Sequence, residues 1–140
     1  MFKILNPEVP GEIGENSIID YSIHPPKVQK LHYVFDTWLG SDIVESFPCF
    51  LVTERLRKRI EDEILGGISF FDIEIATTER FKEFYPSRVL PTFYWMKVDG
   101  IAGKDDFGLS ENYRLVLSPK VLETLSSFTL KEADFEIYKK

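Results

Sequence analysis

The residues best suited to chemistry gather in one glycine-containing segment, residues 99–108. Asp99, Asp105 and Asp106 carry carboxylates, which are ligands that hard cations prefer, but the ligand spacing of a calcium-binding loop is absent. Asp106-Phe107-Gly108 also matches the metal-binding triplet of protein kinases, although the glycine-rich phosphate loop and the HRD catalytic segment are missing. We therefore interpret the three acids as a solvated turn and predict no metal site.

The other nucleophiles and acid–base groups form no catalytic motif. His24 and His32 are the only histidines, and neither lies in an HExxH pattern. Cys49 is the single cysteine, and its apolar flanks predict a buried, unreactive thiol. No GxSxG, GxGxxG or Walker sequence occurs, so we predict no catalytic residue and no cofactor. A hydrolase with an acidic site outside any motif stays an alternative, because 23 Asp and Glu residues provide many acid pairs.

The segment 99–108 has the composition of a binding loop. Three glycines raise the conformational entropy that is lost when the segment is ordered. Phe107 stands beside two acids, an arrangement that contributes little to the stability of an isolated domain. In the binding interpretation Phe107 is the anchor, and Asp105 and Asp106 meet arginine or lysine of a partner. In the alternative interpretation the segment is a hairpin connection, and Phe107 turns back into the core.

A second acidic surface is predicted on the strand 70–76. Apolar Phe71, Ile73 and Ile75 alternate there with Asp72 and Glu74, which indicates one face in water. The predicted partner-binding residues are therefore Asp99, Asp105, Asp106, Phe107, Asp72 and Glu74.

Composition limits the class of partner. The 140 residues carry a formal net charge of −6, which disfavours nucleic-acid binding and is compatible with a protein partner that has a basic face. Aromatic residues make up 14% of the chain, enough to supply a contact surface as well as a core. No apolar run reaches the length of a membrane helix, and the first residues lack a signal-peptide core. We predict no membrane association and a cytoplasmic location.

The predicted fold is a single α+β domain with a mixed or antiparallel sheet. Residues 1–30 are rich in Pro, Gly and polar groups, and we expect them to form an extended N-terminal arm over a domain of residues 31–140. Thr53 and Ser118 are suitable N-caps for helices at 54–65 and 119–126, and Thr77-Thr78 begins a short helix to residue 84. Strands are expected at 31–35, 47–52, 70–76, 92–98, 113–117 and 133–138.

An internal repeat runs through these elements. A shift of 65 residues places Thr53 on Ser118 and Ile60 on Leu125, each within a strand, a capped helix and a second strand. The repeated segments are 51–75 and 116–140. We expect two similar strand–helix–strand units packed on one sheet, whether by duplication or by convergence.

Several short motifs from Val34 onward resemble a known family. They are FDTWLGSD (35–42), FLVTERL (50–56), GISF (67–70), LPTF (90–93), DDFGL (105–109) and LVLS (115–118). The pattern is similar to a family of uncharacterised bacterial proteins that includes immunity proteins of polymorphic toxin systems. Such proteins are encoded beside a toxin and bind it to block its activity. The motifs contain caps, turns and strand starts but no catalytic residue, and residues 1–30 have no counterpart.

The resemblance implies a cytoplasmic protein-binding domain that neutralises a cognate toxin, with an acidic surface facing a basic toxin face. The alternatives are a structural or regulatory domain that self-associates or binds through a sheet edge, and the hydrolase considered above.

Overall fold

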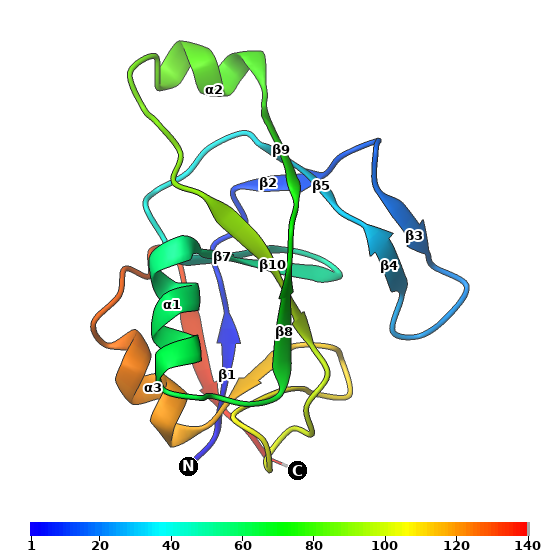
Figure 1. Ribbon diagram of the computed structural model, residues 1–140, viewed down its shortest axis with the longest axis vertical. Coiled ribbons are helices and arrows are strands. Elements are labelled where there is room, and N and C mark those ends of the chain that lie inside the picture. The colour runs from blue at the N-terminus through cyan, green and yellow to red at the C-terminus, as the bar shows by residue number, and fades with distance from the viewer. Residues whose placement is uncertain (140) are drawn as a thin grey trace.

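The computed structural model describes residues 1–139 as three helices and thirteen strands in four small sheets (Figure 1). The α+β single-domain prediction is confirmed. The strands do not form one common sheet, however, so the two predicted units do not share a sheet as we expected. No helix within residues 1–139 combines the length and the apolar character needed to cross a membrane.

The first unit forms a four-stranded antiparallel sheet in the order β6-β7-β10-β8. Its strands are β6 (Ile43–Ser46), β7 (Cys49–Thr53), β10 (Phe93–Val98) and β8 (Ile68–Phe71). The helix α1 (Glu54–Asp62) connects β7 to β8, and these two strands lie on either side of β10.

The second unit forms a sheet of the same design in the order β11-β12-β1-β13. Its strands are β11 (Phe107–Leu109), β12 (Leu115–Leu117), β1 (Lys3–Asn6) and β13 (Asp134–Ile137). The helix α3 (Pro119–Leu125) connects β12 to β13, and these strands flank β1 just as β7 and β8 flank β10. The predicted repeat therefore corresponds to a repeated topology. Each unit has a hairpin followed by a helix and a third strand, and an antiparallel strand from elsewhere in the chain lies between the hairpin and the third strand.

The interpretation of residues 1–30 as an arm needs correction. β1 is an inner strand that pairs with β12 on one side and β13 on the other. β2 (Gly11–Ile13) pairs with β5 (His32–Phe35), which pairs in parallel with β9 (Glu74–Thr77). β3 (Ile18–Asp20) and β4 (Lys27–Lys30) form a hairpin that projects from the body of the molecule in Figure 1. The N-terminal residues thus complete two sheets and add a projecting hairpin.

The sheet β6-β7-β10-β8 is the central layer, and β7 is buried throughout. One face carries Phe50, Val52 and Met96 into a core shared with α1, α3 and the sheet of the second unit. Leu51 and Trp95 point to the other face, into a second core with β5 and the helix α2 (Glu79–Phe84). Because side chains alternate along a strand, β7 reads as a continuous apolar run that serves both cores.

Local signals predict the starts of the helices better than their ends. Thr53, Thr78 and Ser118 are the N-caps of α1, α2 and α3, and each side chain accepts a hydrogen bond from a backbone N–H of the first turn. The helix α1 ends at Asp62 rather than residue 65. Ile64 adopts the left-handed conformation (φ 53°) and is 85% exposed, so it lies beyond the helix and does not join the buried Leu56 and Ile60.

Candidate functional site

Phe107 lies in the shared core and is 2% exposed. It cannot serve as a partner anchor while the domain is folded, and its interpretation as an exposed anchor is corrected. The predicted alternative, in which Phe107 turns back into the core, describes its position. Its backbone also explains two nearby glycines, because a Cβ at Gly67 or Gly100 would come within 2.3 Å or 2.2 Å of the Phe107 carbonyl oxygen.

The acids of the same segment fix the backbone around them. Asp105 accepts a hydrogen bond from the backbone N–H of Ile101 at 2.7 Å, which closes the turn. Asp106 accepts from the Ser118 hydroxyl at 2.7 Å and from the backbone N–H of Gly66 at 3.0 Å. Asp99 is exposed. The carboxylates of Asp105 and Asp106 thus have structural partners within the chain.

The second predicted surface is also partly occupied. Glu74 accepts from the Asn16 amide at 2.9 Å, and it lies 3.4 Å from the Lys30 ammonium and 3.6 Å from the His32 imidazole. The Asn16 hydrogen bond, with the nearby His32 and Lys30, lowers the pKa of Glu74. These contacts attach the β3–β4 hairpin to β9. Asp72 is exposed, and no hydrogen bond or ion pair of the described residues joins it or Glu74 to the acids of segment 99–108.

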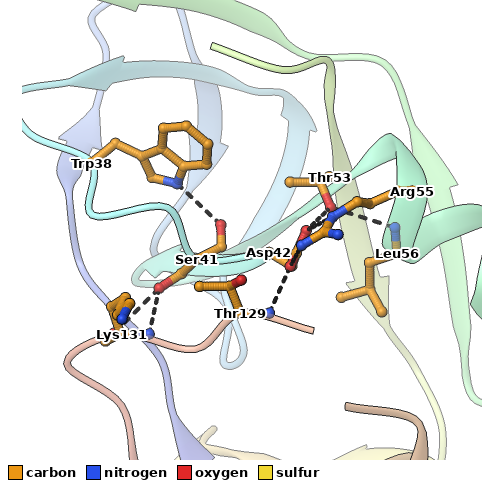
Figure 2. Close-up of polar contacts among 8 residues, drawn as sticks. All are labelled: Trp38, Ser41, Asp42, Thr53, Arg55, Leu56, Thr129 and Lys131. Carbon is orange, nitrogen blue, oxygen red and sulfur yellow. Dashed lines mark hydrogen bonds and ion pairs between the residues drawn. The ribbon is translucent and has the colours of Figure 1, made fainter. Parts of the chain in front are cut away.

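Asp42 is the centre of the densest polar network (Figure 2). Its carboxylate is buried and accepts from the Thr53 hydroxyl (2.7 Å), the backbone N–H of Thr129 (2.8 Å), and Nε and Nη2 of Arg55 (2.7 and 2.5 Å). The neighbouring Ser41 hydroxyl accepts from the backbone N–H of Lys131 at 2.8 Å. With four donors around one carboxylate, Asp42 has no free lone pair directed at a substrate, and its role is structural.

The same arrangement occurs at all three helix N-termini. Each N-cap hydroxyl donates to an aspartate that lies next to a strand: Thr53 to Asp42, Thr78 to Asp36 at 2.8 Å, and Ser118 to Asp106. A hydroxyl that donates to a carboxylate must present its lone pairs to the helix, so the aspartate orients the cap. The negative charge also lies favourably near the positive end of the helix dipole.

Two of these aspartates connect the repeated units reciprocally. Asp42 of the first unit accepts from Thr129, which follows α3, and Asp106 of the second accepts from Gly66, which follows α1. The backbone repeats the exchange, because Asp42 N–H donates to Thr129 O and Phe107 N–H donates to Gly66 O. The two units therefore bind each other through equivalent contacts in both directions.

Burial changes the acidity of several of the remaining reactive groups. Burial raises the pKa of the Cys49 thiol to about 12, so the nucleophilic thiolate is scarce at neutral pH. Burial also raises the pKa of Tyr33, and it raises the pKa of Glu45 to about 7. Within residues 1–139, no three His, Cys, Asp or Glu side chains lie together in a way that could hold a metal ion.

An apolar groove lies beside the projecting hairpin. It has a volume of about 370 Å³ and lies between the 21–26 connection of the β3–β4 hairpin, the β6–β7 turn and β10. Its apolar walls consist of Ile23, Pro25, Pro26, Val28, Phe47, Pro48, Phe50, Trp95, Met96, Val98, Leu109 and Tyr113. Ile23 and Phe47 are 46% and 53% exposed, so large apolar side chains stand at its rim in water.

The sequence prediction missed this groove because its walls come from distant segments. Two signals were present: the apolar Ile23 beside Pro25-Pro26, and Phe47 before Pro48 at a turn. Apolar side chains in turns are candidates for exposure, since turns lie at the surface. Neither signal indicates that the two turns meet.

Comparisons with protein-family models, with curated protein sequences and with solved structures found no match to this chain.

Proposed function

We propose that this chain is a protein-binding domain of the immunity type, which binds a cognate toxin in the cytoplasm and blocks its activity. The observation that supports the binding role most strongly is the apolar groove beside the projecting hairpin. Ile23 and Phe47 at its rim are about half exposed. Exposed aromatic and aliphatic side chains that line a preformed depression are typical of surfaces covered by a partner.

The positions of the acidic residues favour binding over hydrolysis. A general acid or base needs a carboxyl group that is free to contact a substrate. Asp36, Asp42 and Asp106 instead hold the N-caps of the three helices, and Asp105 closes a turn. The described acids with well-defined partners therefore support the fold.

Net charge supports a partner that is basic overall. At −6, the chain attracts a cationic protein over distances of about one Debye length, roughly 8 Å at physiological salt. This attraction accelerates association, while the contacts within the interface determine how long the complex lasts.

The decisive experiment is co-expression with the protein encoded beside this chain. We expect the neighbouring protein alone to arrest growth, co-expression to restore it, and the purified pair to form a stoichiometric complex in calorimetry. A neighbouring protein that is not toxic, or that is toxic and unaffected by this chain, would refute the immunity function.

A second candidate is self-association through a sheet edge, and the exposure of β13 favours it. Within residues 1–139, β13 pairs only with β1; all four of its residues are exposed, and Phe135 and Ile137 are 44% and 53% exposed. An open edge strand with apolar side chains is a template for pairing with another strand. Light scattering across a concentration series distinguishes the candidates, since a monomer at all concentrations excludes self-association.

A further inference from the structure

The groove carries a charge opposite in sign to the chain as a whole. Among its described lining residues the charged ones are Lys27 and Lys97, and both side chains are exposed. Neither has an ion-pair partner within 4 Å among residues 1–139. Asp20 lies opposite Lys27 in the β3–β4 ladder, but it accepts its hydrogen bonds from Ser22, at 2.5 Å from the hydroxyl and 2.9 Å from the backbone N–H. In a chain of net charge −6, the two lysines form a local cationic rim around an apolar depression.

The apolar part of the groove is held in place by packing on both sides. Phe50 and Met96 belong to the shared core, and Trp95 belongs to the second core; the Trp95 ring also contacts the tilted ring of half-exposed Phe71 at a centroid distance of 5.0 Å. Phe47 packs on Tyr113 at 6.4 Å. The groove floor is therefore preformed, and a ligand does not bear the entropy of ordering it.

We propose that the groove binds a short segment of the partner in which an aromatic or large aliphatic side chain lies next to a carboxylate. The apolar side chain enters between Ile23 and Phe47, and the carboxylate reaches Lys27 or Lys97 at the rim. This inference rests on the proposed binding function and names the chemistry of its recognition site. The partner, which is basic overall, would then carry a local acidic element, and this element would fix the orientation of the complex.

The first test uses a defined probe, 8-anilinonaphthalene-1-sulfonate, which joins an aromatic body to one negative charge. We expect it to bind the native chain at one site, with affinity that falls as salt increases. The variant Lys27→Glu/Lys97→Glu should weaken binding by about tenfold or more, because it replaces attraction by repulsion at the rim. Phe47→Ala should also weaken it, through the lost apolar contact.

The matched control is Lys104→Glu/Lys139→Glu, which makes the same change of net charge at exposed lysines outside the groove. It should leave probe affinity within about twofold, since remote charges are screened. The neutral probe Nile red should bind the native chain and the Lys27/Lys97 variant alike. If the two glutamates impair folding, the variant Lys27→Gln/Lys97→Gln replaces them in this test, because it removes the positive charges without adding negative ones. Equal losses in the groove and control variants, or no loss in either, would overturn the proposal.

The second test measures the toxin complex with the same variants. The proposal expects the Lys27/Lys97 and Phe47 variants to weaken the complex by about tenfold, and the control to weaken it by less than about threefold. A complex of unchanged affinity in the groove variants would overturn the groove as recognition site and leave the immunity function intact. Absence of any complex, with the probe still bound in the groove, would instead refute the immunity function. Binding of phosphatidylserine vesicles through the groove in place of the toxin would also overturn the proposal.

Discussion

The reciprocal aspartates allow a quantitative test of how the two units are joined. Asp42→Ala removes a buried carboxylate that accepts from Thr53, Thr129 and Arg55. Asp106→Ala removes the equivalent carboxylate of the second unit, which accepts only from Ser118 and Gly66. Both substitutions leave an N-cap hydroxyl without its orienting partner, so the difference between them reports on the additional contacts of Asp42.

The magnitudes follow from the contacts. Hydrogen bonds to a charged group contribute about 1.5–3 kcal/mol each, with the lower value suited to partly exposed donors. The Arg55 side chain is 61% exposed, so its pair with Asp42 contributes at most about 1 kcal/mol. At the lower value for each bond, we expect Asp42→Ala to lower the free energy of unfolding by about 4 kcal/mol and Asp106→Ala by about 3 kcal/mol, the difference being the Arg55 pair. Asp42→Asn keeps the shape of the side chain, but its NH2 group would face other hydrogen-bond donors. We expect this substitution to lower the free energy of unfolding by about 2 kcal/mol.

Equilibrium urea unfolding followed by circular dichroism measures these changes, with the slope m checked for constancy. Asp72→Ala is the matched control, because Asp72 is an exposed aspartate, and it should change stability by less than about 0.5 kcal/mol. The reasoning is refuted if Asp42→Ala is no more destabilising than Asp106→Ala, or if both behave like the control.

Three further predictions concern buried and half-buried side chains. Burial raises the pKa of Glu45 to about 7 from 4.5, so the folded state retains a proton that the unfolded chain releases, and stability declines as pH rises from about 4.5 to about 7. Glu45→Gln should therefore raise the unfolding free energy at pH 8 by about 1–2 kcal/mol, a value discounted for partial exposure, and should have no such effect at pH 4; urea titrations at the two pH values test this. Cys49 should react with a thiol reagent only as fast as the chain unfolds, and rapid labelling of the native chain would contradict the burial of the thiol. Thermal melts of the chain should coincide with and without reductant or chelator. Ile60→Ala and Leu125→Ala should each destabilise by roughly 2–5 kcal/mol in denaturant unfolding, because both side chains lie in the shared core; a neutral result for either would show that its helix does not pack there.

The features that sequence predicted well are those with local causes. Thr53 and Ser118 were recognised as caps because the signal is a hydroxyl residue directly before a helical pattern. The repeat was visible because both units need the same order of strand, cap and helix. Elements that depend on distant partners were missed. β1 is a strand because β12 and β13 lie on both sides of it, more than 100 residues away in the sequence. Nothing within Lys3–Asn6 indicates those partners.

The candidate site was harder to predict for the same reason. The sequence leaves Phe107 open between an anchor beside two acids and a side chain that turns back into the core, because β11 has only three residues, too few for alternation to show which side faces the core. Asp42 did not enter the predicted site at all. The repeat contains the signal that would have found it, because Asp42 precedes Thr53 by 11 residues and Asp106 precedes Ser118 by 12. The 65-residue shift that aligns the caps places Asp42 on Phe107, so the aspartates pair only when a one-residue gap is allowed; with that gap both belong to the same structural position.

The groove lies where the two units differ. Each unit has a four-stranded sheet, a capped helix and a reciprocal aspartate. These shared features explain how the chain folds, and they do not distinguish one unit from the other. The β3–β4 hairpin belongs to neither copy of the repeat, and it forms the groove together with β10, the β6–β7 turn, and Leu109 and Tyr113 of the second unit. Glu74 secures the hairpin through Asn16 and Lys30, so this addition has a fixed position on the body. A feature that the repeated scaffold does not need, and that still places Ile23 and Lys27 over a preformed apolar depression beside Lys97, is better explained by recognition than by folding.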